Sequence, residues 1–381
     1  MKNVYWRPQA VSRTALILVG LISLGGLFLV ENFRVGVEKP HYEEKLAASQ
    51  LAEQAFDAVK TARLRRGISI DPETDPTYSG LIGIAMSPAT TKTGALTAKQ
   101  TAINPNFAAV VLEMLKNAGV KRGDVVAVGC SGSFPALNIC VYAALETLKV
   151  RPVIISSATA SQWGANHPNF LWMDMENVLY DSNLVSFRST ATSIGGYEDQ
   201  AIGLPDEARK VIANAAERNR LMLIEADSLE KNIEQRMKIY AKNAAGSPIR
   251  AYINVGGGTV STGAARGKRA FKPGLNLRPP IGIRQIEGIM PQFSVKRIPA
   301  IHLVQIADLA EQYGLPVPPM EMPTVGEGAI FYGVEYNRWL AVAVLAVIMA
   351  GLYAFVRSSI GFRLLNAKGG AGRETSLEPM V

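Results

Sequence analysis

The segment 125–138, VVAVGCSGSFPALN, places a serine in a loop of small residues between an apolar run and a proline. A strand–turn–helix connection with the pattern G-x-S-x-G is typical of the nucleophile elbow of serine hydrolases, although Ser133 stands here in place of the last glycine. A nucleophilic serine needs a base and a carboxylate that orients the base. The chain order of Ser131, Asp227 and His302 matches that of α/β hydrolases, so these three residues are one candidate catalytic set.

The same loop can instead bind an anion. Serine and glycine leading into Pro135 at a first helical position direct hydroxyls and backbone N–H groups to one spot, where the helix dipole favours a carboxylate or phosphate. A second loop of this kind, GGGTVSTG, spans 256–263. A tight turn that binds nothing is the simpler alternative for either loop. The candidate anion- or polymer-binding residues are Ser131, Gly132, Ser133, Asn138, Gly256, Gly257, Gly258, Thr259, Ser261 and Thr262.

The second loop does not match the nucleotide-binding motifs. No G-K-[ST] follows it, and Ser261 occupies the third glycine position of G-x-G-x-x-G. Histidines scattered at 41, 167 and 302 give no zinc-ligand spacing with the two cysteines, Cys130 and Cys140. We therefore expect no cofactor and no metal, and two free thiols that pack like small apolar residues.

Segment 161–180 gathers aromatic and ionisable side chains after an apolar run. A combination of aromatic residues and carboxylates suits a binding cleft. Taken singly, each of these residues is more typical of packing or helix capping. The possible cleft residues are Trp163, His167, Asp174 and Glu176.

Apolar runs alternate with helical patterns through the middle of the chain. Strands are predicted at 81–87, 124–129, 152–157, 221–225, 251–256 and at the start of 301–314. Helices are predicted at 41–66, 104–119, 135–148, 205–219, 228–244 and at the end of 301–314, and 271–299 is predicted to be irregular. Strands that are apolar on both faces and separated by helices indicate an α/β, three-layer, mostly parallel Rossmann-like sheet with helices on both faces. Such sheets bind ligands beyond the carboxyl ends of their strands, where both small-residue loops fall.

Two segments without charge, 15–30 and 339–356, lie near the chain ends. As helices they would be about 24 and 27 Å long, close to the ~30 Å hydrocarbon core, so one transmembrane helix is predicted at each end. No A-x-A-like cleavage site follows the first segment, which favours a retained anchor. Basic residues flank both spans on their terminal sides and predict cytoplasmic termini and an extracytoplasmic middle.

The predicted organisation has seven parts. They are a cytoplasmic N-terminus (1–13), a transmembrane helix (14–33), a membrane-proximal helix and linker (34–79), an extracytoplasmic α/β domain (80–323), a linker (324–338), a second transmembrane helix (339–356) and a cytoplasmic tail (357–381). The terminal parts carry much of the formal charge of +8, so the basic balance does not indicate a nucleic-acid partner.

Four segments together resemble the poly-gamma-glutamate system protein family: GDVVAVGCSGSFPALN, PVIISSATASQWGANHPNFLWMDMENVLY, IEQRMKIY and AYINVGGGTVSTG. The resemblance covers about 80–330, and the terminal apolar segments fit it. It implies a membrane component of poly-gamma-glutamate synthesis or export, whose partners are the ligase and membrane subunits of the synthase, the anionic polymer and the lipid bilayer. It implies no catalytic residues.

We expect an accessory role, in which the outer domain binds the polymer or scaffolds the synthase. Two alternatives remain open at this point. One is a serine-dependent hydrolase or transferase that acts on the polymer, and the other is a purely structural membrane scaffold.

Overall fold

The computed structural model describes residues 13–357. The chain divides into two compact units, one of Glu38–Tyr332 and one of Met1–Val37 with Gly333–Val381. Nearly all of the predicted cytoplasmic segments, 1–13 and 357–381, lies outside the described residues.

The larger unit is built on one sheet of seven strands. Their order is β7-β6-β3-β2-β8-β10-β9, and every neighbouring pair is parallel except the antiparallel pair of β10 and β9. The mostly parallel α/β sheet predicted from the sequence is therefore confirmed. The strands are β2 (Val125–Ser131), β3 (Arg151–Ser157), β6 (Ala191–Ser193), β7 (Met222–Ile224), β8 (Ile249–Val255), β9 (Gly274–Asn276) and β10 (Ala300–Leu303).

The strand order changes direction between β2 and β8. From β2 the chain moves outward through β3, β6 and β7, and it then returns to β8 on the other side of β2 before it reaches β10. Pairing in register sets Gly129 of β2 opposite Asn254 of β8. The loops that leave these two strands consequently start side by side at a topological switch point.

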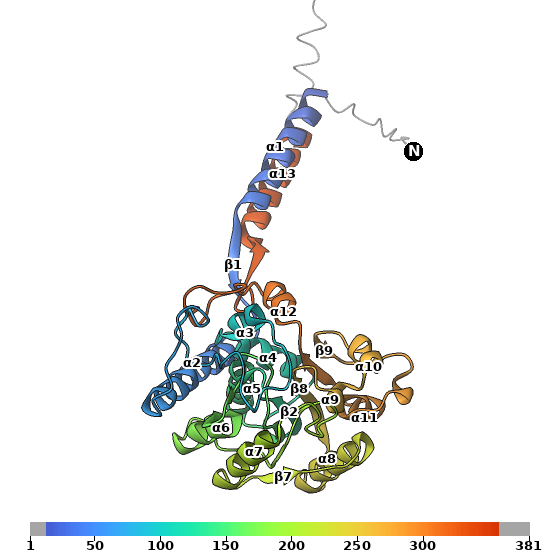
Figure 1. The fold of residues 1–381 in the computed structure, drawn as a ribbon. Coiled ribbons are helices and arrows are strands. Elements are labelled where there is room, and N and C mark those ends of the chain that lie inside the picture. The colour runs from blue at the N-terminus through green and yellow to red at the C-terminus, as the bar shows by residue number, and fades with distance from the viewer. Residues whose placement is uncertain (1–12, 358–381) are drawn as a thin grey trace, which may run out of the picture. The chain divides into compact units, whose positions relative to one another are not determined.

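Helices cover both faces of the sheet (Figure 1). Val126 and Val128 of β2 face α2, α4 and α5, whereas Val125 and Ala127 face α8 and α11, because successive side chains of a strand point to opposite sides. The helices of this unit are α2 (Tyr42–Arg65), α3 (Leu96–Ala102), α4 (Phe107–Asn117), α5 (Pro135–Leu148), α6 (Trp172–Asp181), α7 (Asp206–Arg218), α8 (Leu229–Asn243), α9 (Thr259–Thr262), α10 (Ala265–Ala270), α11 (Ile289–Val295) and α12 (Ile306–Gln312), with a 3-10 turn at Ile283–Gln285.

The strand predicted at 81–87 is wrong. Leu81 and Ile82 are buried, but no strand of the described chain lies beside this segment to bond to Ile84. The backbone N–H of Ile84 donates to Oδ1 of Asn166 at 2.9 Å, and Nδ2 of Asn166 donates to the carbonyl of Ile84 at 2.7 Å. The Trp163 backbone also accepts from the N–H of Gly83 at 3.0 Å and donates to the carbonyl of Ile84 at 3.1 Å, so a loop and an asparagine side chain take the place of a neighbouring strand. Asn166 lies in β4 (Asn166–His167), which pairs antiparallel with β5 (Phe170–Leu171).

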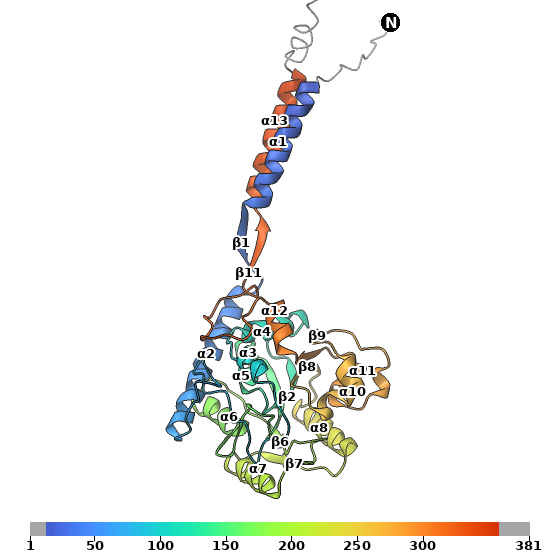
Figure 2. The same ribbon diagram turned by 45° about the horizontal axis from the view of Figure 1, so that its top comes forward.

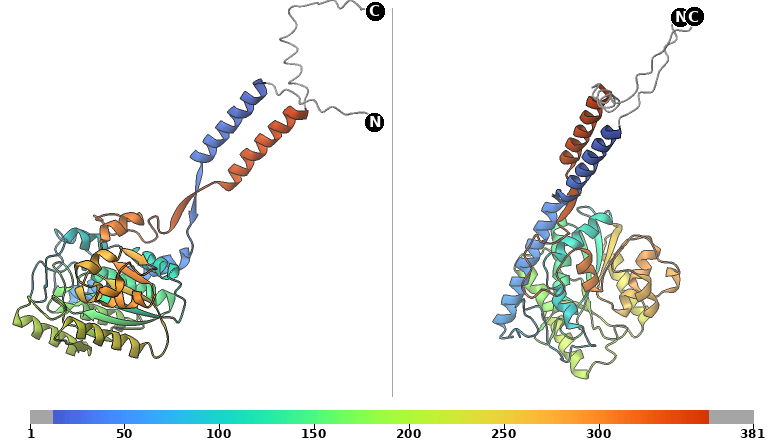
Figure 3. Two further views of the ribbon diagram at one scale, coloured as in Figure 1. Left: turned by 90° about the vertical axis from the view of Figure 1, so that its right-hand side faces the viewer. Right: turned by 90° about the horizontal axis from the view of Figure 1, so that it is seen from above.

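The smaller unit contains two helices of 20 residues, α1 (Arg13–Asn32) and α13 (Arg338–Arg357), which lie side by side (Figures 2 and 3). Strands β1 (Arg34–Glu38) and β11 (Tyr332–Tyr336) pair next to them. Large apolar side chains are exposed along both helices, among them Leu21, Leu24, Phe28, Leu345 and Met349. Within the described part of the chain, no helix is long and apolar enough to cross a membrane. The spans predicted at 14–33 and 339–356 therefore lack support from the structure.

Candidate functional site

A cleft of about 700 Å³ opens at the switch point between β2 and β8. Ser131 at the end of β2 and Ser133 in the following loop line one side of it. The other side is lined after β8 by Gly256, Gly257 and Gly258 of the loop and by Thr259 and Ser261 of α9. The two loops are in contact, because a Cβ atom added to Gly256 would lie 3.3 Å from Cβ of Ser131. Gly256 also has a φ of +87°, a conformation that glycine adopts at little cost. The structure thus brings most of the predicted loop residues into one site.

The other three predicted residues, Asn138, Thr262 and Gly132, contact the backbone of the loops and of neighbouring segments. Asn138 is buried and donates from Nδ2 to the carbonyl of Ser131 over 2.9 Å, and buried Thr262 donates from Oγ1 to the carbonyl of Gly258 over 3.1 Å. Gly132 packs against the carbonyl of Thr159, where a Cβ atom would come within 2.7 Å. These three residues shape the cleft and do not line it.

The serine loop uses several of its hydrogen-bonding groups internally. The Oγ atom of Ser131 accepts from the backbone N–H of Ser133 at 3.2 Å. The Oγ atom of Ser133 accepts from the backbone N–H of Ser161 at 2.9 Å. The predicted cradle of Ser131 and Ser133 donors therefore offers an anion fewer free N–H groups than the sequence pattern implies.

Three lysines that the sequence analysis did not select also line the cleft. Lys92 and Lys268 are exposed, whereas Lys99 of α3 is only 4% exposed. Burial lowers the pKa of Lys99 to about 7, and the charge of Lys92 contributes to this shift. Partial burial lowers the pKa of Lys92, with a smaller contribution from Lys268. The three lysines lie outside the strands and follow no motif, so their spacing in the sequence does not predict that they share a site.

Arg236, Asp199 and His302 also line the cleft. Arg236 and Asp199 are its other charged residues. They form a buried ion pair in which each side chain is 6% exposed. The negative charge of Asp199 is thus matched by its partner, and the exposed lysines Lys92 and Lys268 leave the cleft with a positive balance.

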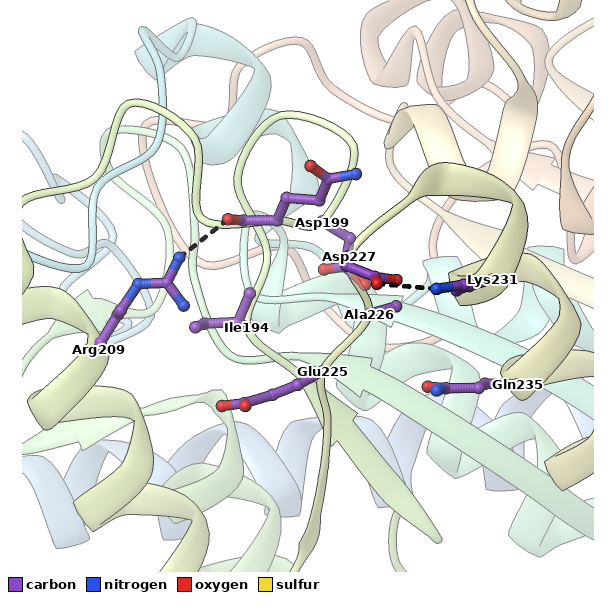
Figure 4. A pocket seen from close by; sticks show the side chains of 9 residues that line it. Ile194, Asp199, Arg209, Glu225, Ala226, Asp227, Lys231 and Gln235 are labelled. Carbon is purple, nitrogen blue, oxygen red and sulfur yellow. Dashed lines mark hydrogen bonds and ion pairs between the residues drawn. The ribbon is translucent and has the colours of Figure 1, made fainter.

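The candidate catalytic set is not assembled. His302 is 2% exposed, and its Nδ1 atom lies 3.2 Å from Nδ2 of Asn254, which can only donate, so the proton of the neutral ring is on Nε2. Burial lowers the pKa of His302 to about 4. Asp227 lies beyond β7 in another pocket and pairs with Lys231 at 2.8 Å (Figure 4). Strands β6, β3, β2 and β8 separate β7 from the strand of His302.

The aromatic and ionisable residues of 161–180 do not line this cleft. Asp174 accepts from the backbone N–H of Leu171 at 2.8 Å and pairs with Arg218, as expected of a residue in the first turn of α6. Glu176 is buried and accepts from Tyr142 and Ser189, and burial raises its pKa. Trp163, in the loop before β4, and His167 of β4 are partly buried, and burial lowers the pKa of His167.

The two cysteines are buried free thiols, as predicted. Burial raises the pKa of both, so neither is an activated nucleophile. Across residues 13–357, no three His, Cys, Asp or Glu side chains are placed to hold a metal ion.

The fold and the cleft define a doubly wound α/β domain with a cationic site at its switch point. No family model, curated protein or solved structure matches the chain.

Proposed function

We propose that the protein is an accessory component of a poly-gamma-glutamate synthesis or export system and that the switch-point cleft binds the anionic polymer. The observation that carries the proposal is the positive balance of the cleft, to which the exposed lysines Lys92 and Lys268 contribute. The resemblance of segments within 80–330 to the poly-gamma-glutamate system protein family supplies the ligand class. Poly-gamma-glutamate carries one carboxylate on each residue, so a cleft with several cations can hold several of its residues at once.

The cleft contributes two kinds of interaction. The exposed ammonium groups of Lys92 and Lys268 attract the polymer electrostatically, and the range of this attraction becomes shorter as the salt concentration rises. The hydroxyls of Ser131, Thr259 and Ser261 lie beside them and can donate hydrogen bonds to carboxylates once the chain has entered.

Charge reversal in the cleft tests polymer binding. We expect the full-length Lys92→Glu/Lys268→Glu variant to bind poly-gamma-glutamate oligomers with a Kd at least about tenfold higher than the wild type. The control, Lys238→Glu/Lys242→Glu, makes the same change in net charge on exposed positions of α8 and should bind like the wild type. Isothermal titration calorimetry at two salt concentrations measures both. Absence of binding by the wild type would exclude the polymer-binding role, and co-purification with the synthase would then favour the structural scaffold.

We further propose that the terminal segments, of which α1 and α13 are the described parts, anchor the protein in the cell membrane. Their exposed apolar side chains require a cover, which a lipid bilayer provides. In this arrangement both termini are cytoplasmic, the α/β unit is extracytoplasmic, and the ligase and membrane subunits of the synthase are neighbours.

Protease accessibility tests this placement. Protease added to intact spheroplasts should digest the α/β unit and leave the terminal helices in the membrane fraction. Antibodies against tags at the two termini should fail to bind until the membrane is opened. Full protection of the α/β unit in intact spheroplasts would exclude the proposed topology.

A further inference from the structure

Lys99 and Ser161 form a side-chain pair in the cleft that polymer binding alone does not require. The Nζ atom of Lys99 lies 2.9 Å from Oγ of Ser161 and also contacts the carbonyl oxygen of Ser133. Both side chains line the cleft, although they are only 4% and 3% exposed. A lysine that serves only to attract an anion keeps its ammonium group in water, as Lys92 and Lys268 do.

The surroundings of Lys99 favour its neutral form. The side chain is 4% exposed, and among residues 13–357 no carboxylate forms an ion pair with it. The Phe134 ring, whose centre lies 3.7 Å from Nζ, acts in the opposite direction, because a ring face attracts a cation, and burial outweighs it. The charged group that faces it is Lys92, and α12, which packs against α3, carries Asp308 and Glu311 without an ion pair to Lys99. Burial and Lys92 together lower the pKa of Lys99 to about 7, so much of it is an amine at neutral pH.

A neutral Lys99 fits its two oxygen partners. One N–H bond can donate to the carbonyl of Ser133, which only accepts, and the nitrogen lone pair is then available to the hydroxyl proton of Ser161. This is the arrangement of a serine nucleophile beside its general base. Ser131, the nucleophile considered from the sequence, has a backbone N–H as its partner and no such base.

We propose that Ser161 is a nucleophile, that Lys99 is its general base, and that the pair cleaves or transfers an amide bond of a substrate held in the cleft. The pair is defined by geometry alone. The identity of the substrate, a gamma-glutamyl amide of the polymer, rests on the proposed function.

The reaction balances without a co-reactant other than water or an amine. Ser161 Oγ attacks the amide carbonyl carbon as its proton passes to Lys99 Nζ. The C–N bond breaks, the leaving amine takes the proton from Nζ, and an ester of Ser161 remains. Water or an acceptor amine then attacks the ester and gives a proton to Nζ, which returns one to Oγ as the C–O bond breaks. The positive charge of Lys92 favours the oxyanion that forms at each attack.

The test uses a fluorophosphonate probe on the full-length protein, with the labelled residue located by mass spectrometry. We expect a single label on Ser161, which is lost in Ser161→Ala, and a rate at least a hundredfold lower in Lys99→Arg. Arginine keeps the positive charge but stays protonated, so it cannot act as the base. Ser182→Ala, an exposed serine at the end of α6, is the matched control and should label like the wild type. The wild-type rate should rise with pH through about 7, as Lys99 loses its proton, and then level off.

Absence of label from the wild type, or a label on Ser131 that persists in Ser161→Ala, would overturn the proposal. Equal labelling rates for wild type and Lys99→Arg would reject Lys99 as the base. Calorimetry of the wild type with poly-gamma-glutamate oligomers separates the two proposals. The wild type should bind the polymer if the proposed function is correct, whatever the outcome of labelling.

Discussion

Replacing Asp199 by asparagine is expected to lower the free energy of unfolding by about 3–5 kcal/mol, because it leaves the buried charge of Arg236 without an opposite charge. One carboxylate oxygen of Asp199 contacts Arg236 and accepts from Nδ2 of Asn232 at 3.0 Å. The other accepts from Oγ of Ser193 at 2.8 Å and from the backbone N–H of Gly195 at 2.7 Å. The carboxylate therefore joins the end of β6 to α8.

A matched control separates burial from charge. Asp227→Asn removes a carboxylate from the pair with Lys231, in which the two side chains are 74% and 61% exposed, and should cost less than about 1 kcal/mol. Urea unfolding of the full-length proteins, followed by intrinsic fluorescence, measures the difference, since Trp172 is completely buried. Equal losses of stability in the two variants would contradict the prediction.

The long helices and strands of the larger unit could be predicted because the spacing of their apolar residues matches the faces that are buried in the structure. The helix predicted at 135–148 coincides with α5 (Pro135–Leu148), where a proline opens the helix, and the strand predicted at 152–157 is β3 with one residue more. Both strands that flank the switch point are apolar on two faces, as buried parallel strands must be. The position of the two small-residue loops at one edge followed directly from this pattern.

The short elements could not be predicted in this way. Strand β6 has three residues, Ala191–Ser193, and β9 has three, Gly274–Asn276, so neither shows an alternation long enough to recognise. The strand predicted at 81–87 has the right composition. The backbone of Gly83 and Ile84 instead bonds to the backbone of Trp163 and to the side chain of Asn166, about eighty residues away, and local sequence carries no sign of these partners.

The chemistry of the cleft was visible only in part. Ser131 and the glycines after β8 could be selected because they follow predicted strands. Lys99 and Ser161 were missed because one lies on a short helix and the other in an irregular segment, and their 2.9 Å contact joins residues that are 62 positions apart. In sequence they are an ordinary lysine and an ordinary serine.

The stability of the wild type relative to Lys99→Met should rise with pH between about 7 and 10, by up to about 1.4 kcal/mol per pH unit. The pKa of Lys99 in the fold is about 7, whereas its ordinary value is 10.5. Between these values the unfolded chain binds a proton at Lys99 and the folded protein does not, so raising the pH favours the folded state. Below pH 7 both states hold the proton, and this dependence disappears.

The measurement is the urea midpoint of full-length wild type and Lys99→Met at several pH values, with the difference between the two taken at each pH. Taking the difference cancels the titration of tyrosines and cysteines that both proteins share. Lys242→Met removes a lysine that is exposed in the fold, so its difference from the wild type should stay constant. Lys92→Met should move the onset of this dependence to higher pH, because the charge of Lys92 contributes to the lowered pKa of Lys99. Parallel curves for wild type and Lys99→Met would mean that Lys99 keeps its proton in the fold, and its contact with Ser161 would then be that of an ammonium donor and not of a base.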